Sequence, residues 1–379
     1  MFLRTFRGRP HEPPASLIEH MRDLYFGHPA YDRRMGSLVH LPANGAIDGF
    51  IGAFPQPLLL HGRRLQGVIT GSFMVEDPAA NPITGARLVR SLLNGPQDVT
   101  IADIANRCSL DFQRVLGCET FDLQSLQWTK ILKPASYALS LLDTRLGSLP
   151  TWPAIGPCNR SCLRQRRAKG ADAVRNGFGD MDIDLEAFVS IFEHFAADFD
   201  MRPAWTRDEL IWLLGQVRRK TRFGSLFIGG VHRATGELAG AYLYFGRRRA
   251  EAMTLQIVAR PEAAELVLGS LFAHAAALGC MVVRGAAFPD ARPLPQRQPL
   301  LPPCERHASP CARRRAAEGH LAGRALVGGL VGEGWTRLVS DEFAEAGAER
   351  SNSRAKPDRP SFRRGPRRAG KTPSVGRDA

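Results

Sequence analysis

The sequence contains no long apolar run. Its beginning, MFLRTFRGRPHEPP, is basic but lacks the apolar stretch of a secretory signal, and no segment reaches the length of a membrane-spanning helix. We therefore expect a cytoplasmic protein without a membrane span. The seven cysteines are odd in number and irregularly spaced, which does not indicate a disulfide framework, so reduced thiols are expected.

Acidic residues are in deficit, but the excess positive charge is uneven along the chain. Lys and Arg number 51 against 37 Asp and Glu, which leaves a net charge of +14. Residues 350–379 hold ten Lys or Arg and two Asp, so +8 of that charge lies there. We interpret residues 346–379 as a disordered basic tail. Aromatics are scarce in it, with only Phe362, so contact with nucleic acid or an anionic surface is the weaker interpretation.

The chain of 379 residues is long enough for two domains, each with its own core. The first is predicted over residues 1–145 as an α+β domain with a mixed sheet. Its expected elements are a helix with a capping box at Ser16 and Glu19, four antiparallel strands from Ser37 to Val75 with a turn at Pro55, helices over 84–94 and 106–117, and strands at 99–103 and 123–132.

A second domain repeats this order of elements. Residues 146–183 are rich in Gly, Pro and Arg, which predicts a linker. Residues 184–345 then show two helices capped at Asp184 and Thr206, three antiparallel strands, a helix after Pro261 and a further strand. The predicted fold class is therefore α+β, with two domains that each contain a mixed, mostly antiparallel twisted sheet flanked by helices.

Residues 290–330 interrupt the second domain, because they are dominated by Arg, Pro, Ala, Leu and Cys and follow neither period. One hypothesis is that this segment is read from a shifted frame. Sequencing the gene tests it, and an unshifted frame would contradict it. The cysteines of C-x3-C at Cys158 and C-x2-H-x3-C at Cys304 are loosely spaced for zinc, so no metal site is predicted.

A strand, a turn and a helix start follow one another in residues 64–94. The strand ends at Asp77-Pro78, because proline cannot donate to a ladder. Thr84, Gly85 and Ala86 then place small residues at the entrance of an amphipathic helix. Free backbone N–H groups at this helix start would meet any anion bound there.

Three motifs resemble the Gcn5-related N-acetyltransferase superfamily over about residues 15–140. They are SFMVEDP, GPQDVTIAD and the N-x-x-S-x-x-F-x-x-V-L-G pattern from Asn106 to Gly117. The resemblance implies an acyltransferase that moves an acetyl group from acetyl-CoA, as co-substrate, to an amine on a small molecule or protein by direct attack. It implies cofactor contacts at Met74, Val75, Asn81, Thr84, Gly85, Ala86 and Asn106. Glu76 and Asp103, at strand ends, are the weak candidates for the general base, and solvated carboxylates are the alternative.

Several residues depart from the family pattern Arg/Gln-x-x-Gly-x-Gly/Ala in the phosphate loop. Asn81 stands at the Arg/Gln position, Thr84 stands at the first Gly, and Pro82 removes one N–H group. Gln113 stands where the family often has a Tyr that protonates the departing thiolate. In the second domain, the segment RPEAAELVL has no Gly in its turn. These departures favour the alternative function, a non-catalytic binding or scaffold protein that has kept the fold and lost its CoA loop.

Overall fold

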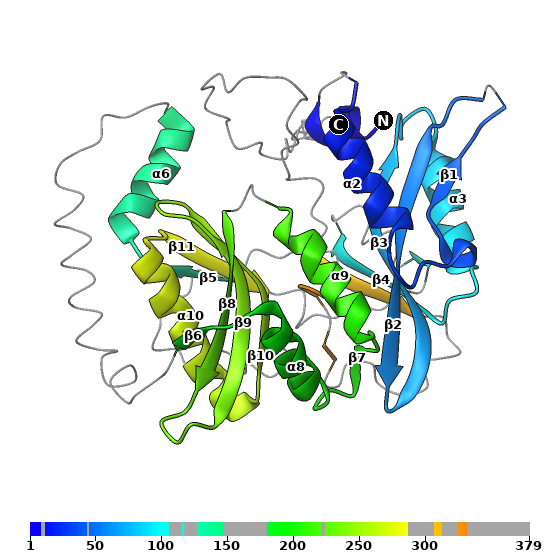
Figure 1. The fold of residues 1–379 in the computed structure, drawn as a ribbon. Coiled ribbons are helices and arrows are strands. Elements are labelled where there is room, and N and C mark those ends of the chain that lie inside the picture. The colour runs from blue at the N-terminus through cyan, green and yellow to red at the C-terminus, as the bar shows by residue number, and fades with distance from the viewer. Residues whose placement is uncertain are drawn as a thin grey trace, which may run out of the picture.

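Two six-stranded sheets with helices on their faces form the framework of the chain (Figure 1). This computed structural model describes residues 1–8, 12–43, 45–105, 115–116, 118, 127–146, 180–220, 224–286, 307–312, 325–326 and 328–331. Each sheet contains one parallel pair and is otherwise antiparallel. The predicted class of two mixed, mostly antiparallel sheets flanked by helices is confirmed.

The first sheet has the strand order β1-β2-β3-β4-β12, with β7 beside β2, and the second has the order β5-β11-β10-β9-β8-β6. The strands are β1 (Leu38–His40), β2 (Gly49–Leu60), β3 (Arg63–Val75), β4 (Val99–Ala105), β5 (Gln127–Ile131), β6 (Asp180–Asp182), β7 (Met201–Pro203), β8 (Ser225–His232), β9 (Leu238–Gly246), β10 (Glu251–Ala259), β11 (Val282–Ala286) and β12 (His307–Ala312). The helices are α1 (Phe2–Arg7), α2 (Ala15–Phe26), α3 (Pro82–Leu93), α6 (Pro134–Leu146), α8 (Leu185–Ala196), α9 (Arg207–Arg218) and α10 (Ala264–Leu278).

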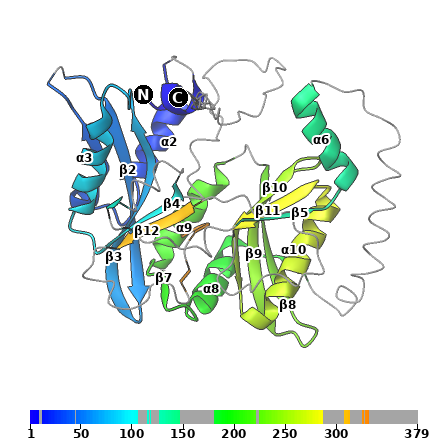
Figure 2. The same cartoon turned by 180° about the vertical axis from the view of Figure 1, so that it is seen from behind.

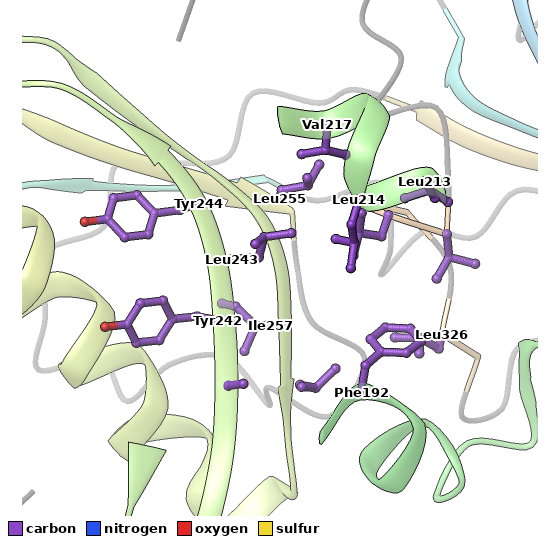
Figure 3. Close-up of a cluster of buried hydrophobic side chains, with 14 of the residues drawn as sticks. Phe192, Leu213, Leu214, Val217, Tyr242, Leu243, Tyr244, Leu255, Ile257 and Leu326 are labelled. Atoms are coloured by element: carbon purple, nitrogen blue, oxygen red, sulfur yellow. The ribbon is translucent and has the colours of Figure 1, made fainter. Parts of the chain in front are cut away.

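The sheets and helices alternate in layers. Helix α3 covers the outer face of the first sheet, α10 covers the outer face of the second, and α2, α8 and α9 lie between the two sheets (Figures 1 and 2). One hydrophobic core runs through this central layer, from Leu17 and Phe54 to Leu214 and Leu243. Figure 3 shows its second-sheet side, where Leu243, Leu255 and Ile257 meet side chains of α8 and α9. The two sheets therefore share this core, and the first sheet has a smaller second cluster under α3, which includes Ile51, Val68 and Leu88.

Two edge strands are exchanged between the halves of the chain. The strand predicted at 123–132 for the first domain exists as β5, but it pairs with β11 of the second sheet, from Gln127↔Ala286 to Ile131↔Val282. In return β12, which lies in the irregular segment 290–330, pairs with β4 of the first sheet. Local patterns identify a strand but not its partner, so the expected place of this strand was wrong. The domain boundaries at 145 and 184 remain predictions.

The predicted turn at Pro55 does not exist, because β2 runs unbroken from Gly49 to Leu60 and replaces two of the four expected strands. The N–H of Ala53 points away from β3 and donates to Ser37 Oγ at 3.0 Å. Pro55, two residues further on, faces the same way, and neither β1 nor β7 pairs with it. At Pro57 the carbonyl on this side accepts from the N–H of Ala204, which follows β7, at 2.8 Å. Pro55 has no strand opposite it and Pro57 lacks only one of the two bonds to Ala204, so neither proline ends the strand.

The helix starts follow the expected capping residues in the second half of the chain. The Asp184 carboxylate accepts from the N–H of Ala187 at 2.7 Å, and Thr206 and Glu209 form a capping box. At α2 the expected box at Ser16 is absent, because the helix begins two residues earlier with Pro14 as N-cap. Helix α3 likewise begins at Pro82, two residues before the expected Thr84, since proline is well suited to the first helical position.

Two expected segments lie outside the described residues. The helix over 106–117, apart from Val115 and Leu116, and the basic tail 346–379 are not among the described residues.

Among the described cysteines, Cys280 is a buried free thiol whereas Cys118 is disulfide-bonded, which corrects the expectation of reduced thiols. No helix in the described ranges has both the length and the hydropathy needed to cross a membrane.

The seam between α2 and α9 contains two buried histidines. Burial, helped by the nearby Lys220 and Arg219 cations, lowers the pKa of His20 to about 4, and burial alone lowers the pKa of His28 to about 4. The His28 ring meets Trp212 of α9 edge-on and accepts from the N–H of Ala30 at 3.0 Å. Arg219 also joins the helices through an ion pair with Asp23 at 2.5 Å.

These histidines should make the fold sensitive to acid. An unfolded histidine takes up its proton near pH 6.5, whereas these two resist protonation until about pH 4, so stability is lost as the pH falls through that window. The interval corresponds to roughly 3 kcal/mol per histidine at most. We expect urea denaturation to show a falling free energy of unfolding from pH 7 to 4.5. His28→Asn, which keeps an acceptor for Ala30, should flatten the slope, whereas the exposed His61→Asn should not. Equal slopes in wild type and His28→Asn would contradict the assignment.

Candidate functional site

The parallel strands β3 and β4 part halfway along β3. They pair from Gly67↔Val99 to Thr70↔Ala102, and then β3 continues through residues 71–75 while β4 continues to Ala105. On the β4 side, none of the described strands pairs with residues 71–75, which we call the open edge of β3. Its backbone groups can therefore bind an extended ligand in the way that an added strand would.

A β-bulge lies at the beginning of the open edge. The pairing of β2 with β3 passes from Gly52↔Gly71 to Phe50↔Met74, so Ser72 and Phe73 stand opposite Ile51 alone. Ser72 has a φ of 51° and is buried. A bulge takes one residue out of the regular ladder and re-aims its backbone groups, and bulges are common beside active sites. The residue types do not indicate this bulge, because Ser72 lies within a continuous β-type run.

The connection from β3 to α3 is closed by Asp77. Its Oδ1 accepts from the N–H groups of Ala79 at 3.1 Å and Ala80 at 3.0 Å, while the N–H of Asn81 donates to the Asp77 carbonyl at 2.9 Å. Asn81 is the N-cap of α3 but makes no side-chain capping bond. The donors of this loop are thus partly used by a carboxylate of the chain itself, and Pro82 has no N–H to add.

The start of α3 packs directly on the end of β3. A Cβ on Gly85 would lie 3.2 Å from Phe73 Cζ and 3.6 Å from Val75 Cγ2, which explains the small residue there. Thr84 is buried, and its Cγ2 would be 2.7 Å from a Cβ on Gly49, so this side chain packs under the helix. Ala86 is half-buried, and the helix has no acidic residue in its first turn. The positive dipole end of α3 therefore lies beside the open edge, and the Asp77 carboxylate in the preceding loop compensates part of it.

The predicted site residues are brought together only in part. Met74 and Val75 lie on the open edge, with Met74 buried in the core, and Asn81, Thr84, Gly85 and Ala86 form the loop and helix start. The backbone of Asp103 lies in β4, but its side chain is not among the described parts, and Asn106 lies outside them altogether. The role of each residue in binding stays a prediction.

The candidate base Glu76 already has a partner. Its carboxylate forms an ion pair with Arg4 of α1 at 2.6 Å, and both side chains are partly exposed. Helix α1 packs against β3, with Phe2 buried in the same core as Met74. An exposed ion pair of this kind is weak and easily exchanged for water. Glu76 is therefore held in a partly exposed ion pair with Arg4, and its role as the general base stays a prediction.

A further titratable pair beside the helix start was missed. His40 Nδ1 lies 2.6 Å from Asp48 Oδ1, and both side chains are mostly shielded, with 21% and 15% exposed. A carboxylate on one ring nitrogen orients an imidazole and leaves the other nitrogen for proton exchange. The pair forms because β1 and β2 are antiparallel, with the Asp48 N–H donating to the His40 carbonyl at 3.3 Å. The PANG turn between them was the available signal.

The second sheet repeats the geometry of the first. Strands β10 and β11 run parallel only from Glu251↔Val282 to Met253↔Arg284, and β10 then continues to Ala259. Its pairing with β9 shifts between Thr254 and Gln256, so Leu255 is the extra residue of a second bulge. The described ranges contain no group of three or more His, Cys, Asp or Glu side chains arranged for a metal ion.

Comparison with known proteins gives likenesses of structure alone. The sequence matches no family model and no curated protein. A chain from Enterococcus faecalis, described as a probable N-acyltransferase of unknown function, aligns with 12% identity and a TM-score of 0.46, over 79% of this chain and 66% of its own. The N-myristoyltransferase of Saccharomyces cerevisiae with bound myristoyl-CoA and inhibitors aligns with 10% identity and a TM-score of 0.45, over 77% and 70%.

A Gcn5-related N-acetyltransferase from Kribbella flavida aligns with 12% identity and a TM-score of 0.48, over 82% of this chain and 68% of its own. This chain spans about two thirds of the length of the Enterococcus faecalis protein. Likenesses at this level do not establish a reaction, so the function has to be inferred from the site.

The loop geometry predicts the effect of Asp77 on anion binding. Asp77→Asn keeps an acceptor for Ala79 and Ala80 but removes a negative charge from the place where a phosphate would lie. CoA should then bind about fivefold more tightly, the equivalent of about 1 kcal/mol for charges a few ångströms apart in water. Titration calorimetry of both proteins measures this. Asp98→Asn is the matched control, because Asp98 accepts from the Gln66 N–H at the opposite end of the strand. Equal affinities for wild type and Asp77→Asn would show that CoA does not bind at this loop.

Proposed function

We propose that this chain is an acyltransferase that takes an acyl group from acyl-CoA, with acetyl-CoA as the donor and an amine as the acceptor. The observation that carries the proposal is the open edge of β3, which begins at a bulge and leads to the N-terminus of α3. Such an edge suits an extended molecule with amide groups and a multiply charged phosphate end, and the pantetheine arm and pyrophosphate of CoA have that form.

The chain would hold the donor with backbone groups more than with side chains. The amides of the pantetheine arm would pair with residues 71–75, and the pyrophosphate would lie at the N-terminus of α3, beside Thr84, Gly85 and Ala86. The thioester would then lie near the Ser72 bulge, where re-aimed backbone groups can stabilise the negative charge that develops on its oxygen. This places the reacting carbon beside the buried part of the site.

In the proposed reaction the amine nitrogen attacks the thioester carbon, the carbon–sulfur bond breaks, and CoA leaves as a thiolate that takes up a proton. The amine has to lose a proton during this exchange. β3 and the loop after it contain two carboxylates, Glu76 and Asp77. Asp77 is bonded to backbone N–H groups, whereas Glu76 is paired with the Arg4 side chain, so Glu76 is the candidate base. The ion pair between Glu76 and Arg4 would have to open before Glu76 accepts a proton. A water molecule can accept the proton in place of Glu76.

The alternative function is a non-catalytic binding or scaffold protein, and specific observations favour it. The loop donors of Ala79 and Ala80 are used by Asp77, Pro82 lacks an N–H, and Glu76 is paired. The acceptor amine, whether on a small molecule or a protein, is not indicated by any of these residues.

Titration calorimetry of the full chain with acetyl-CoA and with CoA tests the proposal. A chain shortened at residue 289 would lose β12, which covers the edge of β4, so it is unsuited to the test. We expect micromolar binding in the wild type. Ala86→Asp, which puts a negative charge at the proposed pyrophosphate position, should weaken binding about tenfold or more, because the two charges repel at close range. Ser91→Asp puts the same charge on the exposed side of α3, more than one turn away, and should bind normally.

The outcomes separate the two functions. Binding that is lost in Ala86→Asp and kept in Ser91→Asp supports an acyl-CoA site and justifies a screen of amine acceptors with a thiol-release assay. Binding without turnover of any amine would favour the scaffold alternative. The absence of binding at millimolar ligand, in a protein shown to be folded by circular dichroism, would refute the proposed site.

A further inference from the structure

The second sheet has the same bulged, early-parting strand as the first, but its edge is already covered. Beyond Met253, β10 loses β11 as a partner, so residues 254–259 form an edge that corresponds to the open edge of β3. Residues 328–331 of the chain lie against this edge. Leu330 and Val331 are 0% and 1% exposed, so the segment is part of the core and not a surface loop.

The covering segment fits the bulge closely. The backbone of Gly329 approaches the carbonyl of the bulge residue Leu255, where a Cβ would stand 2.1 Å from the oxygen. Gly329 has a φ of 63°, and the N–H of Val331 donates to the Gly328 carbonyl at 3.1 Å to close a tight turn. Glycine is therefore required at this position both by the conformation and by the contact.

Gln256 joins β10 to the segment. Its Oε1 accepts from the N–H of Leu330 at 3.1 Å, and its Nε2 donates to the Ile257 carbonyl at 3.1 Å. Upstream, Leu326 donates its N–H to the Met201 carbonyl at 2.8 Å and packs beside Phe192 in the core that Figure 3 shows. The segment thus satisfies one polar group of β10, the Gln256 Oε1, and its backbone packs against the Leu255 carbonyl.

The open edge of β3 is different in kind. The described residues place α1 and the start of α3 near it: α1 is held by the partly exposed Arg4–Glu76 ion pair and by Phe2, and Gly85 of α3 packs on Phe73 and Val75. On the side that β4 leaves, none of the described strands pairs with residues 71–75. One edge is therefore flanked by helices, and the other is filled by a buried turn.

We propose that residues 328–331 are a built-in occupant of the second edge, which makes the second half of the chain a closed site and leaves one acyl-CoA site per chain. The filling of β10 stands on its own contacts. The assignment of the single remaining site to acyl-CoA rests on the proposed function.

Hydrogen exchange with mass spectrometry tests the filling without any ligand. Peptides covering residues 254–259 and 328–331 should exchange slowly in the wild type. Gly329→Ala should displace the turn and speed exchange of residues 254–259 by about tenfold or more, because local opening sets the rate. Gly236→Ala is the matched control: its φ is 83° and open space surrounds it, so it carries the same backbone strain without the contact. Fast exchange in the wild type, or equal rates in both variants, would overturn the proposal.

A second variant guards against misfolding of Gly329→Ala. Gln256→Leu keeps the volume of the side chain but removes the acceptor of the Leu330 N–H and the donor to Ile257. We expect faster exchange in residues 328–331 with the rest of the second sheet unchanged. Unchanged exchange there would contradict the proposed contact.

Titration with CoA separates this proposal from the proposed function. A stoichiometry of one, with binding weakened by Ala86→Asp, supports both. Two sites per chain, or full binding in Ala86→Asp, would overturn the closed second site. No binding at all, together with slow exchange at residues 254–259, would refute the acyl-CoA function and leave the filling of the second edge intact.

Discussion

The exchange of β5 and β12 holds both sheets in their parted form. β4 leaves β3 after Ala102, yet it stays within a sheet because β12 pairs with it as far as Ala105. In the same way β11 leaves β10 after Arg284 and is held by β5 as far as Ala286. A strand that parts from one neighbour needs another for its backbone groups, and each half of the chain supplies that neighbour to the other.

This reciprocal arrangement ties the halves into one folding unit. The core is continuous between the sheets, β7 from the second half pairs with β2, and Arg219 bridges from α9 to α2. Neither half contains all the strands of its own sheet. The two sheets are therefore alike in local geometry only. We expect the two halves to unfold together, because each depends on strands of the other. The same local geometry can be left open in one sheet and filled in the other without a change of fold.

Much of the fold could be predicted because its signals are local. Capping residues marked α8 and α9, the His61-Gly62 turn marked the β2–β3 hairpin, and periodicity marked α3 and α10. The strand exchange could not be predicted, because pairing partners depend on distant residues. The uninterrupted β2 was missed for a related reason: a proline breaks a strand only where its N–H is needed, and that depends on which edge it faces.

The candidate site was predicted in outline and missed in detail. The strand end, the turn and the small residues at Thr84 to Ala86 are in the sequence, and the structure puts them together. The bulge at Ser72 and the loop bonds of Asp77 depend on backbone geometry that residue types do not specify. The His40–Asp48 pair needed the register of a hairpin. Of these missed features, the loop bonds of Asp77 decide how accessible the anion position is.

Pro55 of β2 has a consequence for the behaviour of the protein in solution. Between the stretch covered by β1 and the stretch covered by β7 and Ala204, the described edge of β2 would offer a donor at residue 55 to any passing strand, and proline removes it. A foreign strand cannot complete a ladder along an edge that lacks this donor. The residue that looked like a break in the strand is thus a guard against edge-to-edge aggregation.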